Sequence, residues 1–165
     1  MSVSSEHGWK PAERAALGAA LRDRVGDVVD RMHRLTQEAR GVLEPDIEQA
    51  SVAAAESTTI AVAQAIADAT GPMAESGAGF EPGGFAALVG FQNAPVHEVI
   101  ERCLRWRDCV ASVLMDEAER LDISRGAVRE ALWLTLHTFD ATLVRLGDTY
   151  ELERQDLLGA ILRDR

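Results

Sequence analysis

The sequence predicts an all-α fold, on three observations. Ala, Leu, Val, Glu and Arg recur at helical spacing across residues 11–69, where no alternating run of β-branched and aromatic residues would suit a strand. Glycine and proline gather in one later segment, and apolar residues near the C-terminal end follow a heptad repeat. A chain of 165 residues is long enough to bury one core. We therefore expect a flexible N-terminus at 1–10 and one helical domain at 11–165.

Two helices are expected before the glycine-rich segment. Pro11 suits a first helical turn, and the apolar residues after it advance by fours, threes and a seven, so one long helix should end near Gly41. Its stripe consists of Leu17, Leu21, Val25, Val28, Met32, Leu35 and Val42. A second, Ala-rich helix should run from about Pro45 to Thr70, and its small side chains favour close approach to a neighbour. Its pattern consists of Ile47, Val52, Ala55, Val62 and Ile66.

The segment 71–84, "GPMAESGAGFEPGG", is expected to be the main loop and the most mobile part of the domain. The apolar piece "FAALVGF" that follows could form a turn or two of helix before Pro95.

A third long helix should begin at Pro95. One broad apolar face is formed by Val96, Val99, Ile100, Cys103, Trp106, Val110, Val113 and Leu114. The pairs Glu98 with Arg102 and Glu101 with Arg105 have the favourable Glu-first, i,i+4 order, so we interpret the polar residues mainly as a solvated face.

The last helix should start at Ser124, whose hydroxyl can cap a helix N-terminus. Its heptad seam, with Glu153 in the one skipped place, consists of Leu132, Leu136, Phe139, Leu143, Leu146, Tyr150 and Leu157. Unbroken, this helix would reach about 50 Å, longer than a compact domain of this size needs. Two regular stripes predict a homodimer with a shared four-helix core. The residues assigned to dimerisation are Leu21, Val25, Val28, Met32, Leu136, Phe139, Leu143, Leu146 and Tyr150.

Charge and composition argue against two classes of partner. The formal net charge of −10 repels phosphate backbones, and the basic residues are scattered among acids, so direct nucleic-acid binding is not expected. No uninterrupted apolar run approaches the roughly 20 residues of a membrane helix, and no signal peptide is recognisable. A cytoplasmic protein is expected.

The chemistry-bearing residues form no strong motif. Cys103 and Cys109 lie about 240° apart on one helix, so we interpret them as buried thiols in a reducing compartment. His97 and Glu101 are spaced i,i+4, but no further ligand follows at a fixed spacing, so no metal site is predicted. No nucleophile elbow or phosphate-binding glycine loop is present, and no catalytic residue is proposed.

A ligand pocket is a further hypothesis. Its candidate residues are Cys103, Trp106, Trp133 and His137. His137 is also a candidate ligand for haem or another tetrapyrrole, because such a cofactor needs an imidazole. The alternative is that these side chains serve packing only, with no cofactor bound.

The order of elements resembles the RsbRD-type N-terminal domain, which is found at the front of PucR-type bacterial transcription regulators and of some GGDEF signalling proteins. The resemblance spans about residues 25–160 and includes the stretches "NAPVHEVIERCLRW" and "FDATLVRLGDTYELERQDLL". Its most telling positions are Pro95, Val96, Val99, Ile100, Asp140, Tyr150, Glu153, Arg154 and Leu157.

The resemblance implies a globin-like helical bundle without haem, a homodimer, and a sensory role relayed through the last helix to a C-terminal output domain. A haem-binding sensor and a passive dimerisation scaffold are the alternatives. Two differences from the family pattern bear on ligand contacts. Cys103 replaces a usual aromatic residue, and Asn93 with Ala94 replaces a usual glycine-containing start of the helix.

Overall fold

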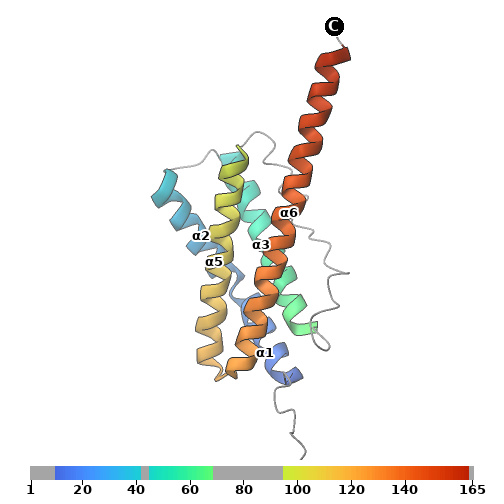
Figure 1. The fold of residues 1–165 in the computed structure, drawn as a ribbon. Helices are drawn as coiled ribbons and strands as arrows, with labels where there is room; N and C mark the ends of the chain where they lie inside the picture. Colours follow the sequence, from blue (N-terminus) through green and yellow to red (C-terminus); the bar gives the residue numbers. More distant parts are fainter. Residues whose placement is uncertain (1–9, 42–44, 69–94, 164–165) are drawn as a thin grey trace, which may run out of the picture.

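The fold is all-α over the part of the chain that the structure describes, which confirms the predicted class. This computed structural model describes residues 10–41, 45–68 and 95–163. Its helices are α1 (Pro11–Asp23), α2 (Val25–Arg40), α3 (Pro45–Asp68), α5 (Val96–Arg120) and α6 (Arg125–Arg163). The helices lie side by side as a bundle, and α6 is the longest (Figure 1). The expected loop at 71–84, the short helix before Pro95 and most of the expected flexible N-terminus lie outside the described residues.

The predicted first helix is two helices, which corrects the single element expected from Pro11 to Gly41. Arg24 has φ −104° and ψ 16°, outside the helical range, and separates α1 from α2. Its side chain pairs with Asp27 of α2 and with Glu117 of α5. The apolar stripe continues across this bend, so periodicity alone did not reveal it. Gly41, at φ 79°, ends α2 at the position expected from the sequence.

The close approach predicted for the Ala-rich helix is confirmed where α3 meets α1. A Cβ atom placed on Gly18 would lie 2.6 Å from the carbonyl oxygen of Ala63 and 2.9 Å from the Cβ of Ala67. Only glycine fits at this crossing without displacing the backbone of α3.

The helix α3 also contains an apolar segment, Glu48–Asp68, that is long enough to cross a membrane by length and composition. Core helices of soluble proteins meet the same criterion. Here Val62, Ala63 and Ile66 are buried in the hydrophobic core of the bundle. The finding is therefore weak evidence for a membrane span.

The predicted cap at Ser124 is confirmed, because its hydroxyl accepts a hydrogen bond from the backbone N–H of Ala127 at 3.4 Å. The same hydroxyl donates to Oε2 of Glu13 on α1 at 2.9 Å. The start of α6 is thus tied to the start of α1.

The α6 helix buries a face that differs from the predicted seam. Phe139 is 1% exposed, as predicted, but Leu136 is 44% exposed. The buried face instead contains short side chains, Ala127, Ala131, Thr135, Thr138 and Thr142. On α5, Val96 and Ile100 are 40% and 37% exposed, so the apolar face predicted after Pro95 is narrower than expected.

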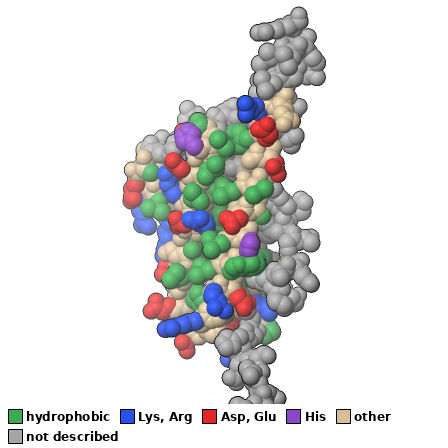
Figure 2. Space-filling model, in the orientation of Figure 1, with side chains coloured by type: hydrophobic (Ala, Val, Ile, Leu, Met, Phe, Trp, Pro, Cys, Tyr) green, Lys and Arg blue, Asp and Glu red, His purple; other side chains and the backbone are tan. Residues whose placement is uncertain are grey.

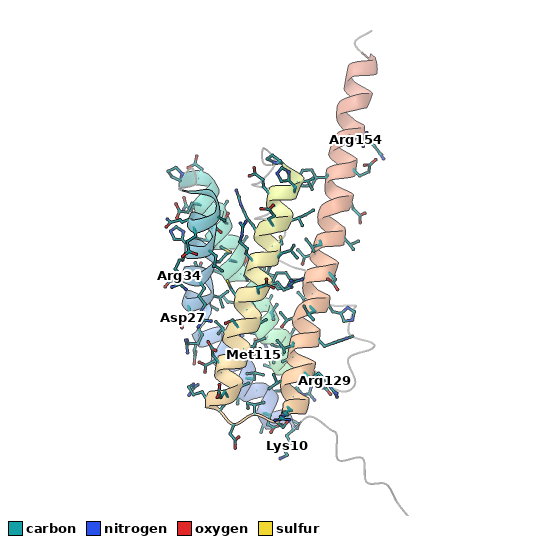
Figure 3. The ribbon with its side chains drawn as sticks, turned by 60° about the vertical axis from the view of Figure 1, so that its left-hand side comes forward. Lys10, Asp27, Arg34, Met115, Arg129 and Arg154 are labelled. Atoms are coloured by element: carbon teal, nitrogen blue, oxygen red, sulfur yellow. The ribbon has the colours of Figure 1, made fainter. Side chains whose placement is uncertain are left out.

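Beyond the bundle, α6 continues past the ends of the other helices (Figure 1). Arg154, whose side chain is 75% exposed, marks this part of the helix (Figure 3).

Candidate functional site

A partly open cavity of about 40 Å³ lies between α2, α3 and α5. It is lined by Met32, His33, Thr36, Glu48, Ser51, Val52, Ala54, Ala55, Thr58, Val99, Arg102, Cys103 and Trp106. Short side chains on α3 leave this space open, because alanine, serine and threonine cannot reach α5 at this level. A cavity of this size holds several waters or a small molecule.

The walls of the cavity are almost entirely apolar, and Arg102 is the buried charged side chain among them. Arg102 is 7% exposed, and its Nη2 lies 3.7 Å from Oε2 of Glu98. The i,i+4 pair predicted from the sequence is therefore present, as is Glu101 with Arg105 at 3.2 Å. Arg102 is nevertheless buried, which corrects its own assignment to the solvated face, whereas the side chain of Glu101 is 44% exposed.

Both cysteines are buried, as predicted. Burial raises the pKa of the Cys103 thiol to about 11, and the nearby positive charge of Arg102 opposes this rise. Burial also raises the pKa of Cys109. At neutral pH, Cys103 therefore presents a protonated, weakly polar thiol to the cavity.

His33 and Glu48 connect the two helices at the edge of the cavity. Nδ1 of His33 on α2 lies 2.7 Å from Oε1 of Glu48 on α3. The other ring nitrogen, Nε2, lies 2.7 Å from Nε2 of Gln37. This pairing holds the Glu48 carboxylate toward α2.

Trp106 joins the cavity to the last helix. Its indole Nε1–H donates a 2.9 Å hydrogen bond to the hydroxyl of Thr59 on α3. Its ring also packs on Phe139 of α6, with ring centroids 4.1 Å apart and planes inclined by 54°. One side chain that lines the cavity thus contacts both α3 and α6.

Of the four pocket residues predicted from the sequence, the structure brings two together. Cys103 and Trp106 line the cavity, whereas Trp133 and His137 lie on the outer side of α6. Trp133 is 42% exposed, and its ring packs edge-on against His137 with centroids 3.8 Å apart. These two residues are one helical turn apart and point away from the side that carries Phe139.

The arrangement does not fit a tetrapyrrole. His137, the candidate haem ligand, is exposed on α6 and does not line the cavity. His33 does line it, but its two ring nitrogens are engaged by Glu48 and Gln37. The cavity of about 40 Å³ is also far smaller than a porphyrin ring.

The residues assigned to dimerisation fall into four groups. Leu21, Val28, Met32 and Phe139 are between 0% and 6% exposed and belong to the core of a single chain. This corrects their assignment, because side chains enclosed by their own chain cannot also contact a second copy. Val25, Leu143 and Tyr150 are partly buried, Leu136 is exposed, and the side chain of Leu146 lies outside the described set.

Most of the residues that line the cavity were not predicted from the sequence, because they come from three different helices. Met32 was assigned to another surface, and Arg102 was interpreted as a solvent-exposed partner of Glu98. The run of alanines on α3 was the one signal of reduced side-chain volume there.

Among the described residues, no group of three His, Cys, Asp or Glu side chains is placed to hold a metal ion. Comparisons with protein-family models, with curated proteins and with solved structures found no significant match to this chain.

Proposed function

We propose that this chain is a sensory and dimerisation module of a bacterial signalling or transcription regulator. In this proposal, the cavity between α2, α3 and α5 receives the signal, and α6 relays it to a C-terminal output domain. The proposal is supported by the arrangement of the cavity and by the sequence resemblance to RsbRD-type domains. It assigns the chain a role in binding and relay rather than in catalysis.

The observation that carries the proposal is the position of Trp106 between the cavity and Phe139. A ligand that displaces the indole ring must also change the packing of Phe139, because the two rings are in contact. Packed interiors respond to such displacement by moving between discrete arrangements rather than by deforming smoothly. Since α6 extends beyond the bundle, a change at Phe139 would be carried along a single helix (Figure 1).

Dimerisation is supported by apolar side chains that α5 and α6 leave exposed. Figure 2 shows hydrophobic side chains along the face where these two helices lie side by side. Met115 projects from α5, away from the core (Figure 3). Among the described side chains of this pair of helices, the large apolar ones with more than a third of their surface exposed are Val96, Ile100, Met115, Trp133, Leu136 and Val144. A second copy that covers this face would bury them.

The relay is tested by joining residues 1–165 to a dimeric reporter domain whose activity depends on the orientation of the incoming helix. We expect Trp106→Leu and Phe139→Leu to change reporter activity, and the double variant to differ from the sum of the two, because the rings act as a pair. Leu35→Ala is the control, since this side chain is exposed on α2, away from both rings and from the face shared by α5 and α6.

A passive scaffold is the alternative that the same experiment separates. If residues 124–165 alone regulate the reporter fully, or if all three variants behave like the parent chain, residues 1–123 have no sensory role. The chain would then serve only to dimerise its output domain.

A further inference from the structure

The cavity between α2, α3 and α5 is enclosed mainly by apolar surface. Each of these helices contributes a large apolar side chain to the lining, namely Met32, Val52 and Val99. The indole ring of Trp106 also lines the cavity, and its N–H is already bonded to the hydroxyl of Thr59. The ring therefore offers a ligand only its apolar surface.

The charged side chains of the lining are paired with other parts of the protein. The Glu48 carboxylate is held by His33, and Arg102 is paired with Glu98. Burial raises the pKa of Cys103, so its thiol is protonated at neutral pH and is only a weak donor. A polar or charged ligand would therefore lose its hydration in this cavity without gaining hydrogen bonds in return.

Water is a poor occupant of the cavity for the same reason. A buried water is held by roughly three hydrogen bonds to polar groups, which these walls do not supply. Empty space costs the lining its dispersion contacts, because atoms at the surface of a void have no partner on that side. An apolar molecule would restore these contacts without giving up hydrogen bonds of its own.

We propose that this cavity binds a small neutral hydrocarbon, enclosed between Met32, Val99 and the ring of Trp106. This inference rests on the proposed function and deepens it, because it names the chemical class of the signal. A space of about 40 Å³ corresponds to roughly three water molecules, which suits a ligand of about three or four carbon atoms. Since Trp106 also packs on Phe139, such a ligand would contact the side chain that reaches α6.

Isobutene and acetone are matched probes of this site, because they have the same shape and only acetone carries a polar oxygen. Each is titrated into the purified chain, labelled with ¹³C at the methionine methyl groups, and followed by NMR. The Met32 resonance is identified by its absence from the spectrum of Met32→Leu. We expect isobutene to shift this resonance saturably, with an affinity at least about tenfold higher than that of acetone.

Two adjacent alanines of α3 provide matched variants. Ala54 lines the cavity and is 7% exposed, whereas Ala53 is exposed and does not line it. Ala54→Leu should fill the space and abolish the shift caused by isobutene. Ala53→Leu makes the same change outside the cavity and should retain the shift.

Three results would overturn the ligand class. They are no saturable shift with isobutene, equal affinity for isobutene and acetone, or the same affinity for isobutene in the Ala54 and Ala53 variants. The comparison of isobutene with acetone uses the unaltered chain, so it decides the question even if Ala54→Leu fails to fold.

Failure of the ligand class and failure of the relay are distinguishable. If isobutene does not bind but Trp106→Leu still alters the fused reporter, the relay stands and the signal belongs to another chemical class. If isobutene binds and the reporter does not respond, the site exists but is not coupled to α6.

Discussion

The indole Nε1–H of Trp106 and the hydroxyl of Thr59 form a buried hydrogen bond of 2.9 Å between α5 and α3. The Thr59 hydroxyl in turn donates to the carbonyl oxygen of Ala55 at 2.6 Å. Thr59 is 0% exposed and Trp106 is 5% exposed, so no water replaces either partner easily. This bond fixes the orientation of the ring between the cavity and Phe139.

Thr59→Val is expected to destabilise the protein by about 1 to 3 kcal/mol, because it leaves the buried indole N–H without an acceptor. Thr135→Val is the matched control. Thr135 is equally buried, but its hydroxyl donates only to the carbonyl of Ala131 in the preceding turn, so its loss should cost less. Urea unfolding followed by circular dichroism measures both, and equal losses would contradict the assigned role of Thr59.

Gly18→Ala is expected to destabilise the protein by about 1 to 3 kcal/mol through overpacking against α3. The added methyl group would meet backbone atoms of Ala63 and Ala67, which cannot move aside independently. Gly26→Ala, where the added Cβ has open space, should instead stabilise by up to about 1 kcal/mol. Thermal unfolding should therefore shift in opposite directions for these two substitutions.

Glu117→Ala is expected to destabilise the chain more than Asp116→Ala at the adjacent position. The Glu117 carboxylate is 2% exposed and pairs with Arg24 and Arg120, whereas Asp116 is 52% exposed and pairs with Arg31. We expect a loss of about 1 to 3 kcal/mol for Glu117, since both arginines reach solvent after its removal, and at most about 1 kcal/mol for Asp116. Denaturant unfolding of the two variants makes the comparison, and an equal loss would argue against a structural role for the bend at Arg24.

The raised pKa of Cys103 predicts a loss of stability in alkali. The folded thiol, with a pKa of about 11, stays protonated while the unfolded chain ionises near pH 8.5, so stability falls as pH rises between these values. The loss should approach roughly 3 kcal/mol at the upper limit. The chain has one tyrosine and one lysine, and Cys109, whose pKa is also raised by burial, adds a loss of the same sign in this range. Cys103→Ala should therefore make the pH profile of the unfolding free energy less steep, and an unchanged profile would show that other groups cause it.

Self-association through the α5 and α6 face should strengthen as salt is added. Each chain carries a formal charge of −10, so two copies repel one another and counterions screen that repulsion. Leu136→Asp should weaken the dimer, whereas Leu35→Asp, at a similarly exposed leucine on α2, should leave it intact. Sedimentation velocity over a range of salt concentrations measures both effects, and a monomer at every concentration would contradict the proposed interface.

The sequence predicted the helical class, the cap at Ser124 and the end of α2 at Gly41, because each depends on local chemistry. The bend at Arg24 escaped prediction, since it depends on Glu117, 93 positions away in the chain. The exposure of Leu136 was not predicted for a related reason. A heptad places it beside Phe139, but the short side chains of Ala131 and Thr135 bring a different side of α6 onto the core.

The candidate site was only partly predictable because a cavity is defined by what several helices leave unfilled. Cys103 and Trp106 were selected for their chemistry and do line it. Trp133 and His137 were selected on the same grounds, but the rotation of α6 turns them outward. That rotation is set by tertiary packing rather than by residue type.

Because α6 is long, a small tilt of the helix near Phe139 produces a larger displacement at its C-terminal end. Arg163 lies 24 positions beyond Phe139, which corresponds to about 36 Å along the helix axis. A tilt of about 5° pivoting at Phe139 would sweep the tip of this rod by about 3 Å. A small movement of α6 beside the indole ring of Trp106 would therefore become, at the C-terminal end of the helix, a displacement comparable to the diameter of an atom.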